Sequence, residues 1–453
     1  MGFSVQIVFG LAWMGCNFAH VQGFGEASPG LYAGVVRLLG RAYPAVYVLQ
    51  LFAAGLSGQR LILQLCHYGR NGRQNRLSAL WGSLAMMTLP MAMQCHMALL
   101  PYSLVCSAGF LQLSFCCELL GSAGKSGHGG FFRHMDFYEH SASLGSREVF
   151  GLAPFLGIWI CCFVQAALLP EYLFLGAVPV AAVLFLKRKA IAGAKTRLKI
   201  LVSALAALTA AAGICTVSVR NAKAQAENDI SGLEWTMVKR LCWPTLWVDY
   251  GRMPDRLIDV TADVIWESTY YPENMDKIFK PAIEAAMDAG EAKELLAEAA
   301  AGSWRIHYPM IMRQVGWDIL GYCVSPVILQ MQLSGDAYGS HSGRNYAAMR
   351  QYAPVLTRQY VDYCGWWFAA AAVLTAMLFV LRLAAGKMPY GRREAGLAVV
   401  TLVFAACCIC WYTMRGAGIM DYKYTVFINE LWFLWSFKTM EDKNPDEKQG
   451  RRT

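Results

Sequence analysis

Long apolar runs alternate with short polar connectors over most of this chain. Each run approaches or exceeds the ~20 residues that an α-helix needs to cross the hydrocarbon core of a bilayer. The pattern therefore predicts an all-α polytopic membrane protein of about ten transmembrane helices. The predicted spans cover residues 5–21, 43–65, 78–94, 97–119, 150–169, 172–186, 200–219, 364–385, 395–414 and 424–437. The last of these contains Asn429 and Glu430, and an interfacial helix is the alternative there.

Basic residues follow every second apolar run. The connectors after the second, fourth, sixth and eighth runs and the polar tail carry Arg70, Arg73, Arg76, Lys125, Arg133, Arg147, Lys187, Arg188, Lys189, Lys195, Arg197, Lys199, Arg382, Lys387, Arg392, Arg393, Lys438, Lys443, Lys448, Arg451 and Arg452. The short opposite connectors hold only Arg37, Arg41, Arg415 and Lys423. Because cytoplasmic loops are enriched in Lys and Arg, we expect a multi-pass plasma-membrane protein with a cytoplasmic N-terminus.

One long segment between the spans has the composition of a soluble domain. Four parts are therefore expected: a seven-helix membrane module (1–219), an extracytoplasmic domain (220–362), C-terminal membrane helices (363–437) and a cytoplasmic tail (438–453). Alternating β patterns are scarce in the extracytoplasmic domain, which predicts a mostly helical fold.

Two stretches of this domain carry helical signals. Residues 280–302 are rich in strong helix formers, with Gly290 as the expected break and Gly302 as the expected stop. Residues 230–250 repeat tryptophan at positions 235, 243 and 247. Tryptophans beside a span often lie at the headgroup level, which favours an amphipathic helix on the membrane. Packing in the core of the domain is the alternative.

Two very tight hairpins are expected at the outer surface. The third and fourth runs meet in "TLPMAMQCHMALLPYSL" (88–104), which places His96 at the tip. The fifth and sixth meet in "LLPEYLFLG" (168–176), where Pro170 ends the outgoing helix because it lacks a backbone N–H. Glu171 is then the tip of this hairpin, and Glu26 lies in the loop after the first run.

Composition and motifs exclude several classes of protein. The chain is 56% hydrophobic and only 16% charged, and it has no nucleic-acid-binding signature. Its fifteen cysteines lie mostly inside apolar runs, without the paired spacing of a metal site. The segment "FFRHMDFYEH" (131–140) can place His and acidic residues on one helix face, as a metal site does. A solvated loop is the favoured interpretation there, because Arg133 is part of it.

The arrangement of seven spans, an acid in the first outer loop, an outer domain and further spans resembles the GT-C superfamily of membrane glycosyltransferases. The hairpin segments "HMALLPYSL" (96–104) and "FVQAALLPEYLFLGAVPV" (163–180) share in the resemblance, which covers roughly residues 1–220. It implies transfer of a sugar from a polyprenyl-phosphate carrier to a cell-envelope glycan or protein at the outer face of the membrane.

The resemblance also implies roles for particular residues. Glu26, in "HVQGFGEASPG" (20–30), stands where the family keeps its catalytic base. Substrate binding would involve His96, Glu171, Arg37, Arg41, Arg220 and Arg415. The arginines, or a divalent metal ion, would hold the leaving phosphate. The chain departs from the family in having one acid in the first outer loop instead of two.

A membrane transport, flippase or assembly protein without catalytic activity is the alternative. Transporters normally carry ionisable residues at mid-membrane and helices broken by Gly or Pro. The first seven spans hold few such residues, and Arg60 can extend its side chain to the cytoplasmic face. This pattern favours the transferase.

Overall fold

The protein is all-helical wherever the structure describes it. The computed structural model describes residues 44–66, 102–121, 152–169, 172–188, 196–226, 238–242, 249–270, 275–323 and 392–416, with single positions at 32, 191, 230, 235, 246, 373, 377, 380, 381, 384, 431 and 435. Helix accounts for 94% of the described residues, and none of them is in a strand. This confirms the all-α expectation.

Two of the bundle helices run in the same direction. Helix α3 (Pro44–Cys66) packs along α6 (Tyr102–Gly121). The Arg60 guanidinium lies 2.8 Å from the Glu118 carboxylate. Since both residues lie near the C-terminal ends of their helices, α3 and α6 are parallel. The apolar composition of these runs supplies the common core of the bundle, because side chains three and four residues apart share one helix face.

A tight turn joins the next pair of helices. Helix α7 (Leu152–Leu168) ends and α8 (Tyr172–Leu175) begins within a few residues, and the Tyr172 backbone N–H donates to the Leu169 carbonyl at 2.9 Å. The described residues on either side of the predicted fifth/sixth hairpin thus lie at a close turn between helices, and its predicted tip, Pro170 and Glu171, lies outside the described residues. At Gly176, before α9 (Ala177–Leu186), an added Cβ would come within 2.7 Å of the Tyr172 carbonyl oxygen. Glycine is therefore required at this close approach.

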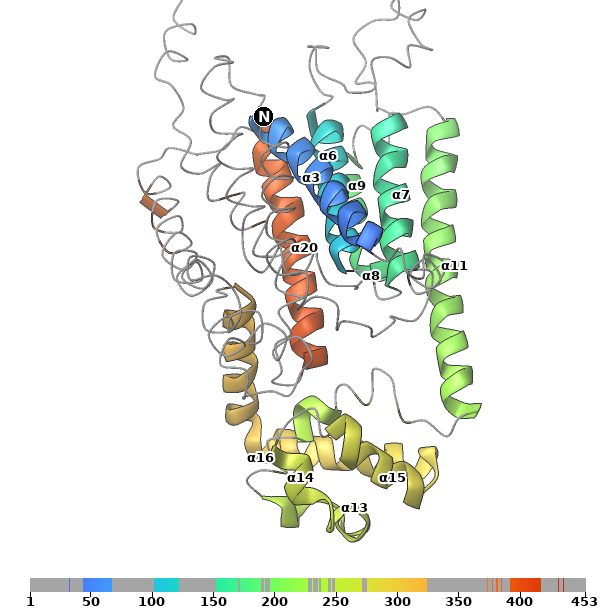
Figure 1. Ribbon diagram of the computed structural model, residues 1–453, viewed down its shortest axis with the longest axis vertical. Coiled ribbons are helices and arrows are strands. Elements are labelled where there is room, and N and C mark those ends of the chain that lie inside the picture. The colour runs from blue at the N-terminus through green and yellow to red at the C-terminus, as the bar shows by residue number, and fades with distance from the viewer. Residues whose placement is uncertain are drawn as a thin grey trace, which may run out of the picture.

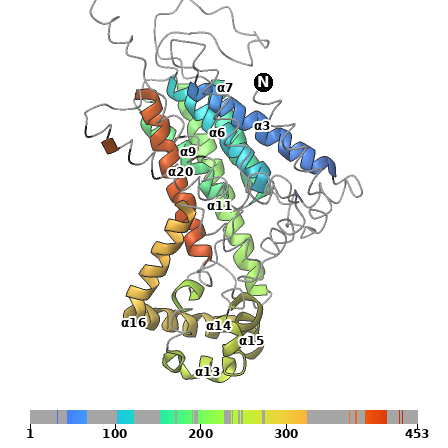
Figure 2. The same cartoon turned by 60° about the vertical axis from the view of Figure 1, so that its left-hand side comes forward.

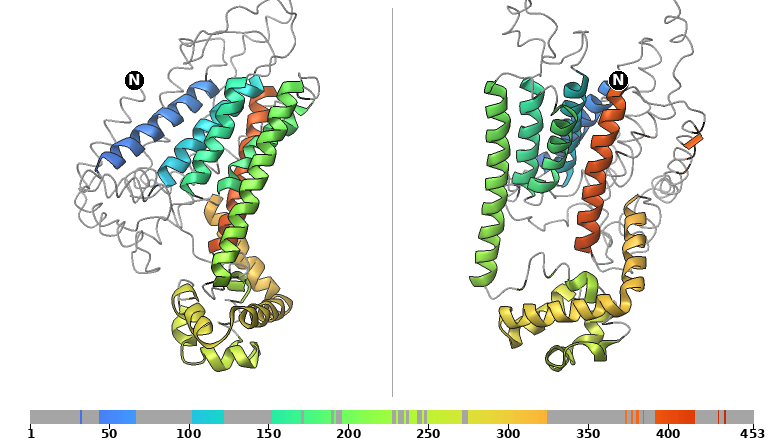
Figure 3. Two further views of the ribbon diagram at one scale, coloured as in Figure 1. Left: turned by 90° about the vertical axis from the view of Figure 1, so that its right-hand side faces the viewer. Right: turned by 180° about the vertical axis from the view of Figure 1, so that it is seen from behind.

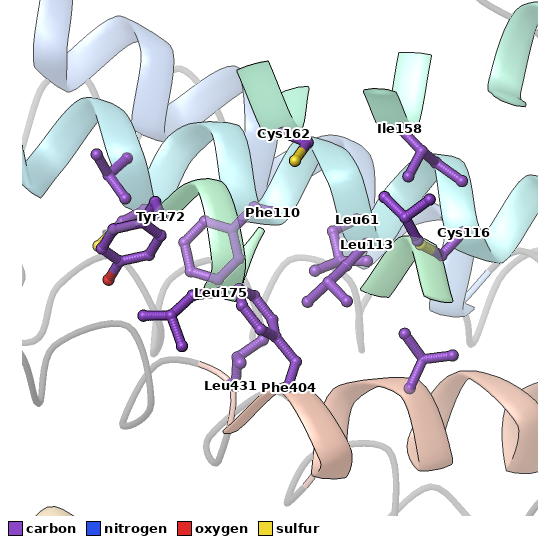
Figure 4. Close-up of a cluster of buried hydrophobic side chains, with 14 of the residues drawn as sticks. Leu61, Phe110, Leu113, Cys116, Ile158, Cys162, Tyr172, Leu175, Phe404 and Leu431 are labelled. Carbon is purple, nitrogen blue, oxygen red and sulfur yellow. The ribbon is translucent and has the colours of Figure 1, made fainter. Parts of the chain in front are cut away.

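Helix α20 (Arg392–Gly416) closes the bundle in the opposite direction to α6 and α9. Near its start, Gly396 faces Leu120 and Leu186 at the ends of those helices. Near its end, the Tyr412 hydroxyl is hydrogen-bonded to the Tyr172 hydroxyl. Figure 4 shows the apolar core between them, with side chains contributed by α3, α6, α7, α8 and α20.

These pairings sort the helix ends onto two faces of the bundle. We name one the basic end, formed by Cys66, Gly121, Leu152, Leu186 and Arg392, because most of the basic connectors adjoin it in sequence. The opposite face, with the other ends of the same helices, is the domain end, because the helical domain described below lies beyond it (Figure 1). The helix directions agree with the alternation predicted from the sequence.

Helix α11 (Thr196–Ala226) stands at the side of the bundle and reaches from the basic end towards the helical domain (Figures 1 and 2). Only 6% of its apolar segment, Lys199–Val219, is buried. Three described helical segments are long and apolar enough to cross a membrane: Ser103–Leu120, Lys199–Val219 and Ala395–Met414. The apolar helices Ala153–Leu168 and Tyr172–Leu186 are shorter.

Six predicted spans coincide with described helices, namely 43–65, 97–119, 150–169, 172–186, 200–219 and 395–414. The predicted spans 5–21, 78–94, 364–385 and 424–437 lie outside the described residues, apart from single helical positions.

The helical domain has a core of its own. It consists of the short helices α13 (Asp255–Thr261), α14 (Ile265–Tyr270) and α15 (Lys280–Ala286), a π-helical turn over Met275–Phe279, and the long α16 (Ala289–Cys323). The side chains at its centre are fully buried: Leu257, Met275, Phe279 and Ile283. The mostly helical fold expected for this segment is confirmed for its described residues.

Two predicted helix boundaries are wrong. The break lies at Met287, which is extended (φ −152°, ψ 160°), and not at Gly290. The helix passes through Gly302 and bends at His307 (φ −110°, ψ 15°), two residues before Pro309. The helix bends near Pro309 because the proline ring clashes with the preceding turn. At Gly302 an added Cβ would contact no other atom, so no close approach requires a glycine or a turn there.

Candidate functional site

Most of the predicted site residues lie outside the described part of the chain. These are Glu26, Arg37, Arg41, His96 and Glu171, and the segment 131–140 lies outside it as well. Their predicted roles stay predictions. The other two, Arg220 and Arg415, belong to described helices.

Arg220 and Arg415 both lie in the C-terminal part of a helix that runs towards the helical domain. Arg220 is in the last third of α11, and Arg415 is the penultimate residue of α20. The ends of these two helices stand on opposite sides of the domain end in Figure 1 and in the right-hand view of Figure 3. The structure therefore places both arginine positions towards the same face but does not bring them together.

The bundle interior carries a network of amides. The Gln112 side chain donates to the backbone carbonyl of Gly176 at 2.8 Å and accepts from Gln165 at 3.0 Å. Gln50 accepts a hydrogen bond from the Tyr32 hydroxyl at 2.6 Å. Buried amides that are hydrogen-bonded in this way fix the register of helices packed in an apolar medium.

An ion pair joins α3 to α6 near the basic end. Glu118 accepts from Arg60 and from Gln64, and the Arg60 guanidinium also lies 4.3 Å from the centre of the Phe115 ring. The sequence interpretation that Arg60 can extend to the cytoplasmic face stays a prediction, and the structure adds that its guanidinium pairs with Glu118 near the basic end.

The most unusual polar group of the helical domain is Arg240. Its side chain is 1% exposed and is paired with Asp318, which is 8% exposed. Asp318 belongs to the part of α16 beyond the bend, so the pair ties this part to the residues 238–242. The Arg240 Nε and Nη1 groups have no hydrogen-bond acceptor in the described structure. A guanidinium that keeps unused donors in a buried position favours an anionic or carbonyl ligand.

Further polar groups stand around Arg240. The Ser303 hydroxyl donates to the Leu241 carbonyl. Asp276 accepts from the Trp235 indole at 2.7 Å and from Lys239 at 2.8 Å. Trp235 is buried among the core side chains of the domain, so core packing is the correct alternative at this tryptophan.

A second polar contact lies at the bend of α16. The His307 Nε2 atom is 3.9 Å from the Asp249 carboxylate, which also pairs with Arg252. The bend thus lies beside ionisable groups from two segments of the chain. Among the described residues no group of three or more His, Cys, Asp or Glu side chains is arranged to hold a metal ion.

Cys242 lies two residues after Arg240, and its side chain is fully buried. Burial raises the pKa of the Cys242 thiol to about 12. A buried thiol with a raised pKa forms very little of the reactive thiolate at neutral pH. This cysteine is a packing residue of the domain core.

Sequence reasoning missed the Arg240–Asp318 pair. Its two members are 78 residues apart, and "VKRLCW" (238–243) has the appearance of the polar face of a surface helix. The available signal was an arginine followed directly by Leu241 and Cys242, two residue types that are usually buried.

Comparison of the chain with protein-family models, with curated proteins and with solved structures finds no match.

Proposed function

We propose that this chain is a polytopic membrane protein with its basic end in the cytoplasm and its helical domain on the extracytoplasmic side. The support is the agreement between the helix directions and the placement of basic residues. Lysines and arginines follow the helix ends at the basic end, and the positive-inside rule relates such residues to the cytoplasm. The proposal includes all ten transmembrane spans predicted from the sequence.

In the same proposal the protein transfers a sugar from a polyprenyl-phosphate carrier to an acceptor on the outer face. The observation that carries it is Arg240, a buried cation with unused donors in a domain that adjoins the bundle. A carrier phosphate needs such a cation when the sugar leaves it. Arg240 is therefore added to the arginines named from the sequence.

The proposed chemistry is a displacement at the anomeric carbon. The acceptor hydroxyl oxygen forms the new bond to this carbon, and the bond from the carbon to the phosphate oxygen breaks. The carboxylate of Glu26 takes the hydroxyl proton as general base. The phosphate leaves with the electron pair of the broken bond, and arginine side chains stabilise its charge.

Binding of the carrier tests the role of Arg240. We expect Arg240→Gln, in the full chain reconstituted in nanodiscs, to weaken binding of polyprenyl phosphate. Asp318→Asn keeps the size of the side chain but removes the competing carboxylate, so we expect it to strengthen binding. Binding is compared per folded chain, with protection of the buried Cys242 thiol from alkylation as the measure of folding. If the folded fractions of both variants bind equally weakly, the pair has a structural role only and Arg240 is not the phosphate contact.

Turnover tests the activity itself. Release of polyprenyl phosphate from sugar-loaded carriers should be detectable with the full chain, and Glu26→Gln should reduce it by roughly 10²–10⁴-fold. A chain that binds the carrier but releases no product with any sugar tested would favour the non-catalytic transport, flippase or assembly protein.

A further inference from the structure

The part of α16 beyond its bend differs from the rest of the helical domain. We name residues 309–323 the ascending arm, because they rise from the domain towards the bundle (Figure 1). Met310, Met312 and Ile319 on this arm are exposed, and Met312 is 52% exposed. The helix surface before the bend is instead charged, with exposed Glu291, Glu294 and Glu298.

The ascending arm lies beside a candidate membrane span. Helix α16 contacts α20, and Figures 1, 2 and 3 show the arm rising alongside the lower part of α20. The apolar window of α20 extends to Met414, almost to the end of the helix. The arm therefore stands at the level of residues that would be surrounded by lipid.

The charges of the arm suit this position. Its charged side chains are Arg313 and Asp318. Asp318 is paired with the buried Arg240, and pairing greatly reduces the free energy of placing a carboxylate in an apolar medium. Arg313 lies one turn from the start of the arm, where a long side chain can extend to the headgroups.

The corner before the arm has the composition of a membrane interface. Trp304, Ile306 and Tyr308 are exposed at the bend, and Tyr308 is 55% exposed. Aromatic side chains concentrate where the headgroups meet the hydrocarbon. A helix that runs along a surface and then turns inward would place its aromatic corner at that depth.

The chain after the arm continues without charge. From Ile319 to Gly335 the sequence contains no Asp, Glu, Lys or Arg. Together with the contact to α20, this favours lipid over a water-soluble protein partner as the surroundings of the arm.

We infer that the ascending arm of α16 is inserted in the outer leaflet of the bilayer and anchors the helical domain there. This inference rests on the membrane placement proposed above and does not depend on the transfer activity. It assigns lipid acyl chains as the partner of Met310, Met312 and Ile319. The segment from residue 309 onward is then not part of a water-soluble domain, although the sequence places it within the soluble range 220–362.

Photo-crosslinking of the full chain tests the inference. The photoreactive residue p-benzoylphenylalanine would replace Met312 on the arm, Leu402 on the lipid-facing side of α20, or Glu298 before the bend, in vesicles of phosphatidylethanolamine and phosphatidylglycerol. After irradiation we expect the mass increase of one phospholipid at positions 312 and 402, and none at position 298.

Each other outcome overturns a distinct statement. Lipid adducts at 402 but not at 312, or crosslinks from 312 to another polypeptide segment, would show that the arm lies in water or against protein. Absence of lipid adducts at both 402 and 312 would overturn the membrane placement itself. Adducts at all three positions would remove the distinction between the arm and the rest of α16, and the inference would fail.

Discussion

The bundle and the helical domain distribute polar and apolar side chains in opposite ways. The bundle buries the amides of Gln50, Gln112 and Gln165 and exposes large apolar side chains such as Leu402, which is 69% exposed. The domain buries apolar side chains such as Phe279 and exposes charged ones such as Glu291, Glu294 and Glu298. Because a folded chain turns towards its solvent the groups that the solvent accepts, the difference supports the proposed placement, with lipid around the bundle and water around the part of the domain before the ascending arm.

The comparison also concerns how each region tolerates a buried polar group. Arg240 of the domain and Asp318 of the ascending arm form a buried ion pair, and removal of one member leaves the other charge with less compensation, which is strongly destabilising. In a membrane the unfolded reference already lacks water, so a lost hydrogen bond changes stability less. The following predictions test whether the bundle and the domain differ in this way.

The largest effect is expected at the Arg240–Asp318 pair. Arg240→Leu removes the guanidinium that pairs with the buried Asp318 carboxylate, and we expect the free energy of unfolding of the domain to fall by about 3–5 kcal/mol. The measurement is the denaturant dependence of Cys242 alkylation, since this thiol is fully buried in the folded domain.

The matched control is the double variant Arg240→Leu with Asp318→Leu, which removes both charges. We expect it to recover most of the lost stability. A single variant as stable as the native chain would mean that water reaches Asp318, and the burial argued for the pair would be wrong.

The next effect concerns the exterior of the two regions. Leu402→Arg places a charge near the centre of the apolar window of α20, and insertion of that helix should become less favourable by about 3 kcal/mol. A reporter fused after α20 measures the inserted fraction.

The control for this variant is Glu298→Arg on the exposed side of the domain, where we expect a change within about 0.5 kcal/mol. If arginine had the same small effect at positions 402 and 298, the two surfaces would not differ as a lipid-facing and a water-facing surface should.

A smaller effect is expected for the amides inside the bundle. Gln112→Leu removes the partner of Gln165 and the bond to the Gly176 carbonyl. We expect a loss of about 1 kcal/mol in the free energy of unfolding in mixed detergent micelles. Ser114→Ala is the control, because the buried Ser114 hydroxyl has no hydrogen-bond partner in the described structure. If Gln112→Leu lowered the free energy of unfolding as much as Arg240→Leu does, the two regions would not differ in how they tolerate loss of a buried polar partner.

The smallest effect at neutral pH is expected from ionisation of Cys242. Its pKa is raised from 9.0 to about 12 by burial, so the folded domain keeps the proton where the unfolded chain has lost it. The resulting contribution to stability is complete below pH 9 and is lost as the pH rises towards 12. Unfolding measured from pH 7 to 11 should therefore show stability that is constant at first and then falls, and Cys242→Ala should reduce the fall.

The sequence was most informative where length and periodicity alone decide the structure. The run 395–414 lies within α20, and the run 172–186 corresponds to α8 and α9 on either side of Gly176, because an apolar segment of this length satisfies its backbone polar groups within a helix. Helix ends were less accurate, as the bend at His307 shows, since Pro309 had to be weighed against a continuous run of helix formers.

The site could be predicted only in part. The pairing of Arg240 with Asp318, or of Arg60 with Glu118, depends on how distant segments pack, and no local pattern encodes it. Trp235 showed the same limit, because a tryptophan in a core and one at a membrane surface leave similar local sequences. The roles of Glu26, His96 and Glu171 stay predictions from the resemblance.

The parallel packing of α3 and α6 has a consequence for the path of the chain. Two consecutive described helices that point the same way require the intervening residues 67–101 to join opposite faces of the bundle. In the proposed membrane placement, any such connection crosses the bilayer an odd number of times, and the same parity applies between the helical domain and the start of α20. Deleting residues 78–94 would therefore change the parity and move everything from α6 onward, the helical domain included, to the other side of the membrane.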